Sequence, residues 1–346
     1  MSNVSSKRIY FLDYARAFAV LLVVLCHVAE RAFDVGQSHW FIYTFIHNFG
    51  RLGVPLFLMI SGALQLRKSV TPGEFYKKSL LPLLLVSEIW IIVNYVVSLL
   101  YTGGGFSIQE LLGQVFFLDS LKLPHMWFIP EIIILYLVVP FIALVVKQFS
   151  LRNMLIPLGI MYATCFVMPT VFHELSITNE NPLLQAPILG GMTGFYLIVG
   201  YYLSHSKIVH KIKTSAIALA LATFVLLNFA IQCLIHYKQQ SIYPLDWYTN
   251  PFLIIIAGLI LVLMKKILDR ETRIYPIMRY VSSAAFGIFF LHYFIIRILG
   301  NYISWFGRPI WFLVALISSF VVSFGAVIIV SKINRRLAFR LFLYKT

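Results

Sequence analysis

The chain has 346 residues, of which 60% are hydrophobic and only 12% are charged, and its formal net charge is +15. A soluble domain carries about 25% charged residues. The composition therefore excludes an ordinary water-soluble protein and predicts an all-α protein whose main solvent is the lipid bilayer. The basic residues are spread along the chain rather than gathered into one stripe, so the charge does not indicate nucleic-acid binding. The three cysteines stand far apart in apolar runs and offer no disulfide or metal-binding pattern.

Apolar runs recur along the whole chain. A helix needs about 20 apolar residues to cross the hydrocarbon core, and the runs predict about ten transmembrane helices. The predicted spans are Ile9–Ala29, Phe49–Leu66, Leu80–Tyr101, Met126–Val146, Met154–Phe172, Pro187–Leu203, Ser215–His236, Pro251–Met264, Val281–Leu299 and Ile310–Val330. The second is interrupted by glycine and proline, and the eighth is short. The stretch Phe106–Phe117 is too short to cross, and we expect it to lie at the membrane interface with Ser107 as a cap.

The basic residues predict the orientation of these spans. Most of the 28 lysines and arginines fall in alternate connecting segments, which is the positive-inside pattern, so both ends of the chain are predicted to be cytoplasmic. Lys7 and Arg8 before an apolar run also fit a secretory signal. Asp13 and Arg16 within that run, and the many spans that follow, favour an uncleaved signal anchor instead. The connecting loops are short, so we expect the chemistry or transport to occur within the bundle or at its mouth.

Ionisable side chains inside the spans are functional candidates, because each costs roughly a few kcal/mol at membrane depth. They are Asp13, Arg16 and His27 in the first span, Glu88 in the third, Glu131 in the fourth and His292 in the ninth, with His125 at the start of the fourth.

The first span carries the most informative pattern. Arg16 and His27 are eleven residues apart, which places them on one helix face about 16 Å apart along the axis. Asp13 precedes Arg16 by three residues and can pair with it. The alternatives are that Arg16 extends to the lipid headgroups and that His27 is a hydrogen-bonded packing residue.

Five sequence blocks extend this pattern over nearly the whole chain. In order they read LDYARAFAVLLVVLCHV, RLGVPLFLMISGAL, FYKKSLLPLLL, HMWFIPEIIILYLVVP and SSAAFGIFFLHYFIIRIL. Together they resemble the membrane-bound acyltransferase 3 family, and within it the short O-acetyltransferases of bacterial surface polysaccharides. The layout is most similar to the enterobacterial common antigen O-acetyltransferase type.

The resemblance implies one membrane domain over residues 1–346, with about ten helices and a cytoplasmic basic tail at 331–346. It implies a multi-pass protein of the bacterial cytoplasmic (inner) membrane. The acyl donor would be cytoplasmic acetyl-CoA, with no tightly bound cofactor, and the acceptor would be a hydroxyl of a cell-surface or lipid-linked glycan. The sequence does not indicate an oligomeric state.

The resemblance also assigns roles to particular residues. Arg16 and His27 match the essential pair of the family. The other matching positions are Lys77 and Lys78 before the third span, where arginine is more usual, His125 and Trp127 in H-x-W, Tyr136 and Pro140 after them, Ser61 and Gly62, and the stretch Ser283–His292. Glu88 and Glu131 are not mapped onto family positions. They could pair with a buried cation or stay protonated, or one of them, with Glu131 as the candidate, could assist His27.

These residues suggest a mechanism for acetyl transfer. We expect His27 to be the general base, since imidazole can take and return a proton near neutral pH. Lys77, Lys78 and Arg16 would bind the CoA phosphates. Cys26 cannot form a nucleophilic dyad with His27, because adjacent residues of a helix point about 100° apart. Attack by the acceptor hydroxyl is therefore expected to be direct.

Each of the other residues also has a purely structural interpretation. Lys77 and Lys78 could be positive-inside anchors, Trp127 a residue of the aromatic belt, and His292 a packing residue. At the level of function, a transporter or flippase of a glycan or small solute is the main alternative, because charges within spans also mark transport pathways. A polysaccharide polymerase would be expected to have larger outer loops.

Overall fold

The computed structural model describes residues 8–33, 40–68, 71–119, 121, 124–175, 188–239, 245 and 247–344. Within these ranges the regular structure is helical and no strand occurs. Among the described residues, eight helices are long and apolar enough to cross a membrane. The prediction of an all-α, multi-pass membrane protein is confirmed.

The eight membrane-length segments follow the apolar runs, and some of them contain a π- or 3₁₀-helical turn (η). They are α1 (Tyr10–Ala32), α4–η1–α5 (Pro72–Phe75, Tyr76–Leu80, Leu81–Thr102), η2–α7 (Pro124–Trp127, Phe128–Gln148), α8–η3–α9 (Leu151–Tyr162, Ala163–Val167, Met168–Glu174), α13 (Thr214–Gln239), α14 (Pro251–Leu268), α15 (Tyr275–Gly300) and α17 (Arg308–Ile333). Helices α14, α15 and α17 carry proline in their first turn. Proline lacks a backbone N–H, and this costs nothing there because the N–H groups of the first turn have no hydrogen-bond partner within the helix.

The other two predicted spans are built from shorter helices. The second, Phe49–Leu66, corresponds mainly to α3 (Gly53–Gln65). Helix α2 (Trp40–Arg51) precedes α3 across Leu52 and lies mostly before that predicted span, where no span is predicted. The sixth is α11 (Gly191–His205), which has 15 residues and follows the 3₁₀ turn η4 (Ile188–Gly190). Pro187, the first residue of that predicted span, lies outside the described ranges.

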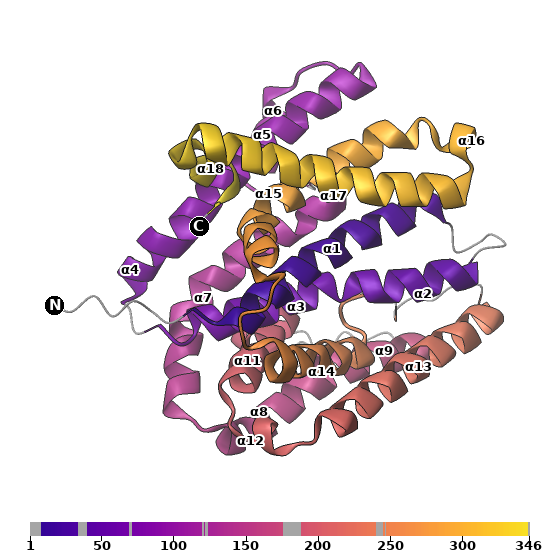
Figure 1. The fold of residues 1–346 in the computed structure, drawn as a ribbon. Coiled ribbons are helices and arrows are strands. Elements are labelled where there is room, and N and C mark those ends of the chain that lie inside the picture. The colour runs from indigo at the N-terminus through magenta and orange to yellow at the C-terminus, as the bar shows by residue number, and fades with distance from the viewer. Residues whose placement is uncertain are drawn as a thin grey trace.

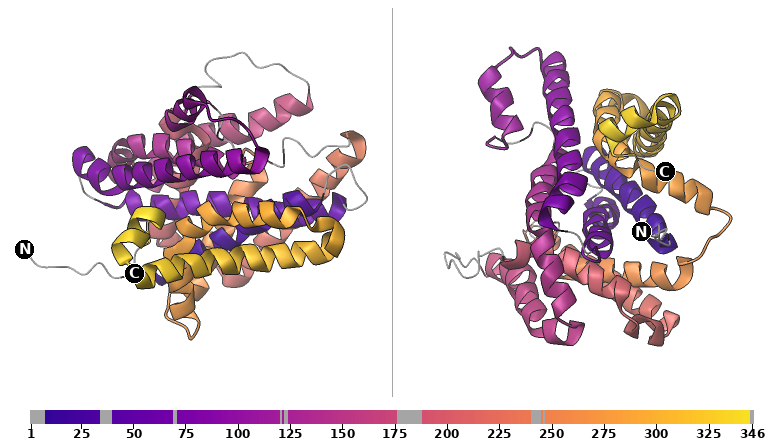
Figure 2. Two further views of the ribbon diagram at one scale, coloured as in Figure 1. Left: turned by 90° about the horizontal axis from the view of Figure 1, so that it is seen from above. Right: turned by 90° about the vertical axis from the view of Figure 1, so that its left-hand side faces the viewer.

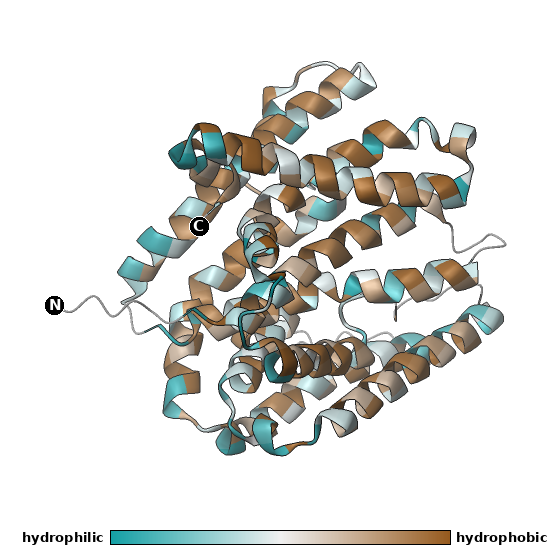
Figure 3. Cartoon of the chain, in the orientation of Figure 1, coloured by the Kyte–Doolittle hydropathy of each residue, from teal (hydrophilic) through white to brown (hydrophobic). Residues whose placement is uncertain are grey.

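Short helices connect or flank the spans. They are α6 (Ile108–Val115), α12 (Ile208–Lys211), α16 (Ile303–Phe306) and α18 (Arg335–Phe342). The predicted cap of α6 is confirmed, since the Ser107 side chain accepts from the Glu110 N–H at 3.3 Å. Figure 3 shows hydrophobic residues along most helices and hydrophilic residues gathered toward helix ends, including α12 and α18.

Helix α1 lies in the middle of the bundle (Figures 1 and 2). It packs against α2, α3, α14, α15 and α17. In the most apolar stretch of α1, 78% of the residues are buried, whereas in the corresponding stretch of α13 only 17% are buried. The helix that carries the predicted functional residues is therefore enclosed by protein, and α13 lies at the periphery.

Glycines allow the helices around α1 to approach closely. A Cβ at Gly50 would lie 2.6 Å from the Cys26 Cα, so α2 runs directly against α1. On α3 and α11, a Cβ at Gly62 would collide with the Leu197 carbonyl oxygen, and a Cβ at Gly200 with that of Met59. Such contacts between small residues are typical of membrane helix pairs.

The predicted basic tail at 331–346 contains helix α18. Helix α17 continues to Ile333, and α18 then folds back against α5, α15 and α17. Trp90 Nε1 donates to the Leu341 carbonyl oxygen at 2.6 Å, and Phe342 is buried. Residues 335–342 are thus a packed helix whose arginines remain on its exposed side.

The α3–α11 contact can be tested with alanine. Gly62→Ala or Gly200→Ala should destabilise the protein by about 1–3 kcal/mol, because the added methyl overpacks the contact. Gly325→Ala on α17 is the matched control: a Cβ there meets nothing within 4 Å, and alanine is favoured over glycine within a helix. Thermal unfolding of the purified protein in detergent measures the difference, and equal midpoints for all three variants would contradict this packing.

Candidate active site

The first turns of α1 form a hydrogen-bonded charge cluster around Asp13. The Asp13 carboxylate accepts from Arg8 Nε at 2.7 Å, from the Tyr275 hydroxyl at 2.9 Å and from the Ser282 hydroxyl at 2.8 Å. Arg16 donates to the Ser282 hydroxyl oxygen at 3.4 Å. The predicted direct pair between Asp13 and Arg16 is therefore wrong, because Asp13 forms its ion pair with Arg8 and Arg16 joins the cluster through Ser282.

Asp13 also acts on Arg8, which precedes the membrane helix. Burial lowers the pKa of Arg8, but the hydrogen bond and the negative charge of Asp13 outweigh this effect and raise its pKa above the ordinary value. Arg8 is thus firmly cationic at this end of α1.

A cavity of about 710 Å³ lies beside the first half of α1, with walls from α1, α3, α5, α7 and α15. Its lining includes the basic residues Arg8, Arg16, Arg67, Lys68 and Lys78, and Asp13 is the acidic residue among the described lining residues. Leu343, directly after α18, completes part of the wall. The volume is within the range of about 300–1,000 Å³ typical of small-molecule sites.

The structure brings several of the predicted site residues to this cavity. Ser61 from α3, Lys78 from the π-helical turn η1 and Tyr136 from α7 line it together with Arg16. Lys77 is exposed and does not line it, because neighbouring helix residues point in different directions. The geometry therefore separates two lysines that the sequence treats alike.

The other predicted residues gather around the far half of α1. His27 Nδ1 lies 2.7 Å from Glu30 Oε2. A carboxylate can only accept a hydrogen bond, so Nδ1 is the donor, and in the neutral imidazole Nε2 then carries the lone pair. Glu30 Oε1 also lies 3.2 Å from Arg51 Nη2 and 3.2 Å from His47 Nε2, and Arg51 Nε donates to that His47 nitrogen at 3.1 Å. His27 thus stands at the edge of a four-residue polar network.

Three histidines from separate elements form a buried cluster. The ring centroids of His27 and His292 are 5.4 Å apart, those of His125 and His292 are 5.1 Å apart, and those of His27 and His125 are 6.0 Å apart. His292 Nδ1 donates to the Ile288 carbonyl oxygen at 3.0 Å, which leaves its Nε2 as an acceptor. Neither this nitrogen nor either nitrogen of His125 has a hydrogen-bond partner among the described residues. Buried polar atoms of this kind indicate a place for water or a ligand.

The histidine cluster and the cavity meet at a pair of phenylalanines. Phe128 follows His125 by three residues and lines the cavity. Its ring centroid is 6.0 Å from that of Phe289, which in turn lies 5.3 Å from the ring of His125. A continuous chain of aromatic contacts therefore links the cavity wall to the histidines.

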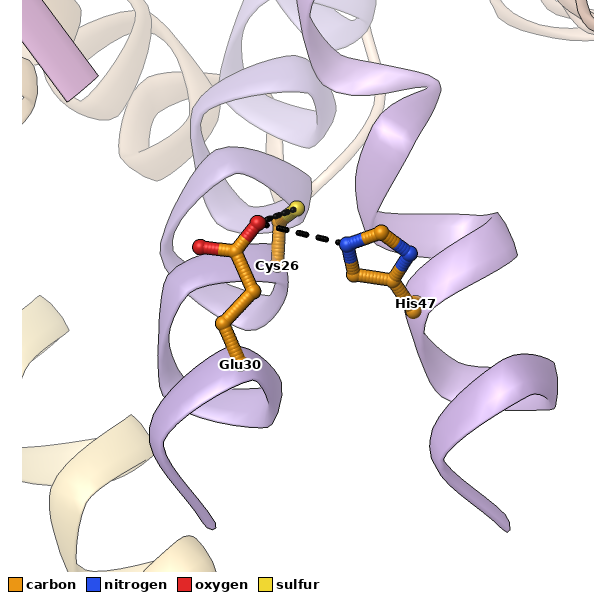
Figure 4. Close-up of side chains that lie close together, drawn as sticks. All are labelled: Cys26, Glu30 and His47. Atoms are coloured by element: carbon orange, nitrogen blue, oxygen red, sulfur yellow. Dashed lines mark hydrogen bonds and ion pairs between the residues drawn. The ribbon is translucent and has the colours of Figure 1, made fainter. Parts of the chain in front are cut away.

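Figure 4 shows Cys26 and Glu30 of α1 and His47 of α2 pointing toward one another. One potential ligand atom from each lies within 4.8 Å of the others, which could suggest a metal ion. Arg51 opposes this interpretation, because its guanidinium contacts both Glu30 and His47. A permanent cation thus already contacts two of the three potential ligands.

Aromatic side chains pack against the Arg51 end of this network. The Arg51 guanidinium carbon lies 5.0 Å from the ring centroid of Trp247 and 5.2 Å from that of Tyr248. Trp127 packs against both rings at 5.4 and 5.0 Å, so it belongs to a defined cluster of side chains. Trp247 is 37% exposed, and the cluster therefore reaches the surface.

The two glutamates singled out from the sequence lie elsewhere. Glu131 is exposed on α7, and no contact joins it to His27 within the described residues. Glu88 on α5 is half-buried, and its Oε2 has no hydrogen-bond partner in the described part of the chain. The carboxylate beside His27 is Glu30, which lies beyond the predicted end of the first span at Ala29.

Other site residues were also missed from the sequence. Glu30 follows His27 by three residues, a spacing that places both on one helix face. The sequence carries no comparable signal for Arg51 or His47, because both lie on α2 and reach Glu30 only through helix packing. Arg67 and Lys68 line the cavity, although the sequence does not distinguish them from the other basic residues between the spans.

Comparison with known proteins identifies the family of the chain. A family model described as an acyltransferase domain, that of the acyltransferase 3 family, matches residues 9–329. The chain belongs to this family and is a membrane acyltransferase, which favours the enzyme over the transporter alternative. Searches of curated proteins and of solved structures find no significant match.

The role of Ser282 can be tested separately from the histidines. Ser282→Ala removes a hydrogen bond to the buried Asp13 carboxylate and should cost about 1.5–3 kcal/mol of stability. Ser283→Ala is the neighbouring control, since its hydroxyl makes no recorded hydrogen bond among the described residues although it lines the same cavity. Thermal unfolding in detergent compares the two variants, and a larger loss for Ser283→Ala would contradict the assignment.

Proposed function

We propose that this protein transfers an acetyl group from acetyl-CoA to a hydroxyl of a cell-surface or lipid-linked glycan, with His27 as the general base. The observation that carries the proposal is the layout of α1. One end of this buried helix lines a basic cavity through Arg16, and eleven residues further along it His27 is held by a carboxylate. The proposed location is the bacterial cytoplasmic membrane, with the cavity on the cytoplasmic side, because the basic residues concentrate at that end.

The cavity supports acetyl-CoA as the donor. Its cations offer hydrogen bonds and charge to phosphate groups, and arginine in particular matches phosphate geometry. Arg67 and Lys68 at the end of α3 and Lys78 on η1 supply charge opposite Arg8 and Arg16. The acyl arm would extend from here along α1, past Phe128 and Phe289, to the histidines. Arg16 and His27 are about 16 Å apart along the helix axis, so an extended arm is needed.

His27 provides the base for the transfer. Its Nε2 removes the proton of the acceptor hydroxyl as the oxygen attacks the thioester carbonyl carbon. The carbon–sulfur bond then breaks, the thiolate of CoA leaves, and the imidazolium returns the proton to the sulfur. A neutral His125 can present one N–H to the carbonyl oxygen as negative charge develops there, a contribution worth about 10²–10³-fold in known oxyanion sites. His292 Nε2 can accept a hydrogen bond from the acceptor.

The acceptor would approach from the aromatic side. Trp247 and Tyr248 pack against Arg51, Trp127 packs against both of them, and Trp247 is partly exposed. Flat aromatic faces suit the apolar faces of sugar rings. A glycan hydroxyl held there could reach the histidine cluster without crossing the donor cavity.

Replacement of the two family residues on α1 tests the scheme directly. His27→Ala should lower transfer by about 10²–10⁴-fold, the usual contribution of a positioned base, and Arg16→Ala should raise the KM for acetyl-CoA. Incorporation of radiolabel from acetyl-CoA into glycan by membranes that contain the protein measures both. Normal labelling by a correctly folded and inserted His27→Ala protein would refute the proposal.

The two adjacent lysines give a test of the donor cavity. Lys78→Gln should raise the KM for acetyl-CoA more than Lys77→Gln does, because only Lys78 lines the cavity. The difference should shrink as salt is added, since ions screen exposed charges. Steady-state kinetics at low and high ionic strength measures the effect, and equal KM values for the two variants would argue against phosphate binding by this cavity wall.

A further inference from the structure

We infer that Glu30 is the positioning residue of His27 and that Arg51, through its ion pair with Glu30, sets how strongly that carboxylate acts on the imidazole. The inference rests on the proposed role of His27 as base and adds the groups that make it an effective one. Neither Glu30 nor Arg51 was assigned a role from sequence.

The contact between Glu30 and His27 fixes the proton arrangement of the base. The 2.7 Å hydrogen bond to Nδ1 selects the tautomer with its lone pair on Nε2. It also holds the ring at the edge of the cluster formed with His125 and His292. When Nε2 takes a proton, the positive charge forms beside the Glu30 carboxylate and is stabilised by it, as in other histidine–carboxylate pairs.

Arg51 limits this stabilisation because it shares the same carboxylate. Its Nη2 lies 3.2 Å from Glu30 Oε1, whereas His27 uses Oε2. The guanidinium is itself buried and packed against the rings of Trp247 and Tyr248. A cation fixed in this position offsets part of the negative potential of Glu30 at His27, and it keeps the carboxylate ionised and oriented.

The helix contact described above brings these groups together. Gly50 lets α2 run against α1 at Cys26. His47 and Arg51, on either side of Gly50, are thereby placed beside Glu30. The break at Leu52 then ends α2 directly after Arg51. The close glycine contact is thus a structural requirement of the charge network.

The surroundings of His27 contain few other charges. The titratable groups around it are Cys26 and Glu30 on α1, His47 and Arg51 on α2, His125 on η2, and His292 and Tyr293 on α15. Further out, Tyr248 packs against Arg51, and Arg31 and Arg297 lie near Tyr293. Of those in direct contact with the Glu30 carboxylate, Arg51 is the permanent cation. Removing Glu30 or Arg51 should therefore change the potential at His27 in opposite directions.

The test compares Glu30→Gln, Glu30→Ala and Arg51→Gln in the full-length protein, purified in detergent and assayed with acetyl-CoA and the glycan acceptor. Glu30→Gln should lower kcat with little change in the KM for acetyl-CoA, and the acidic limb of its pH–rate profile should move to lower pH. Glu30→Ala should lower kcat further, by up to about 10⁴-fold, because an amide oxygen can still accept from Nδ1 and a methyl group cannot. Arg51→Gln should move the acidic limb to higher pH.

Matched controls separate this effect from a general loss of charge. Glu271→Gln and Arg152→Gln make the same chemical changes at exposed positions and should leave the limb in place. Arg51→Lys keeps the positive charge and should keep the limb near its wild-type position. Size-exclusion chromatography and thermal unfolding show whether each variant folds. If Glu30→Gln does not fold, the comparison of Arg51→Lys with Arg51→Gln tests whether the positive charge at position 51 sets the position of the acidic limb.

The outcomes distinguish this inference from the proposed function. If His27→Ala abolishes transfer but the Glu30 and Arg51 variants keep the wild-type limb and lose only stability, Glu30 is a packing residue and the inference fails alone. The inference would also be overturned if the acidic limb of the pH–rate profile moved in the same direction for Glu30→Gln and for Arg51→Gln. If His27→Ala is fully active, the proposed function fails first.

Discussion

Buried charge on a single membrane helix is the constraint on which the structure depends. Helix α1 carries Asp13, Arg16, His27 and Glu30, and each would be costly in contact with lipid. The fold meets this cost by enclosing α1 and by supplying partners from other helices. Tyr275 and Ser282 of α15 donate hydrogen bonds to Asp13, and Arg51 of α2 forms an ion pair with Glu30. The positions of α2 and α15 around α1 therefore satisfy the polar groups as well as bury apolar surface.

The two ends of α1 are organised differently. Around Asp13 and Arg16 the charges line an open cavity of about 710 Å³, where a polar ligand and water can share them. Around His27 the polar groups are packed against one another and against aromatic rings. The first arrangement suits reversible binding of a charged molecule, and the second suits a base that must keep one orientation. Phe128 and Phe289 lie between them.

Much of the fold could be predicted from the sequence, because the length of apolar runs is dictated by membrane thickness. The exceptions are α11, which is short, and α3, which begins after a break. These two helices are positioned by packing rather than by the length of an apolar run, because they contact each other closely at Gly62 and Gly200. In the site, periodicity along one helix correctly places Arg16 and His27 on α1. It could not reveal Arg51 or His125, since their proximity to His27 depends on how separate helices pack.

The cavity wall formed by Leu343 has a consequence for how the protein is made. The cavity lies between α1, among the first helices to leave the ribosome, and a residue that follows α18. The family match ends at residue 329, so this part of the wall comes from outside the matched region. Until α18 has been synthesised and has docked on Trp90, the cavity remains open on that side. The wall of the cavity is thus complete only in a chain whose folding has reached α18.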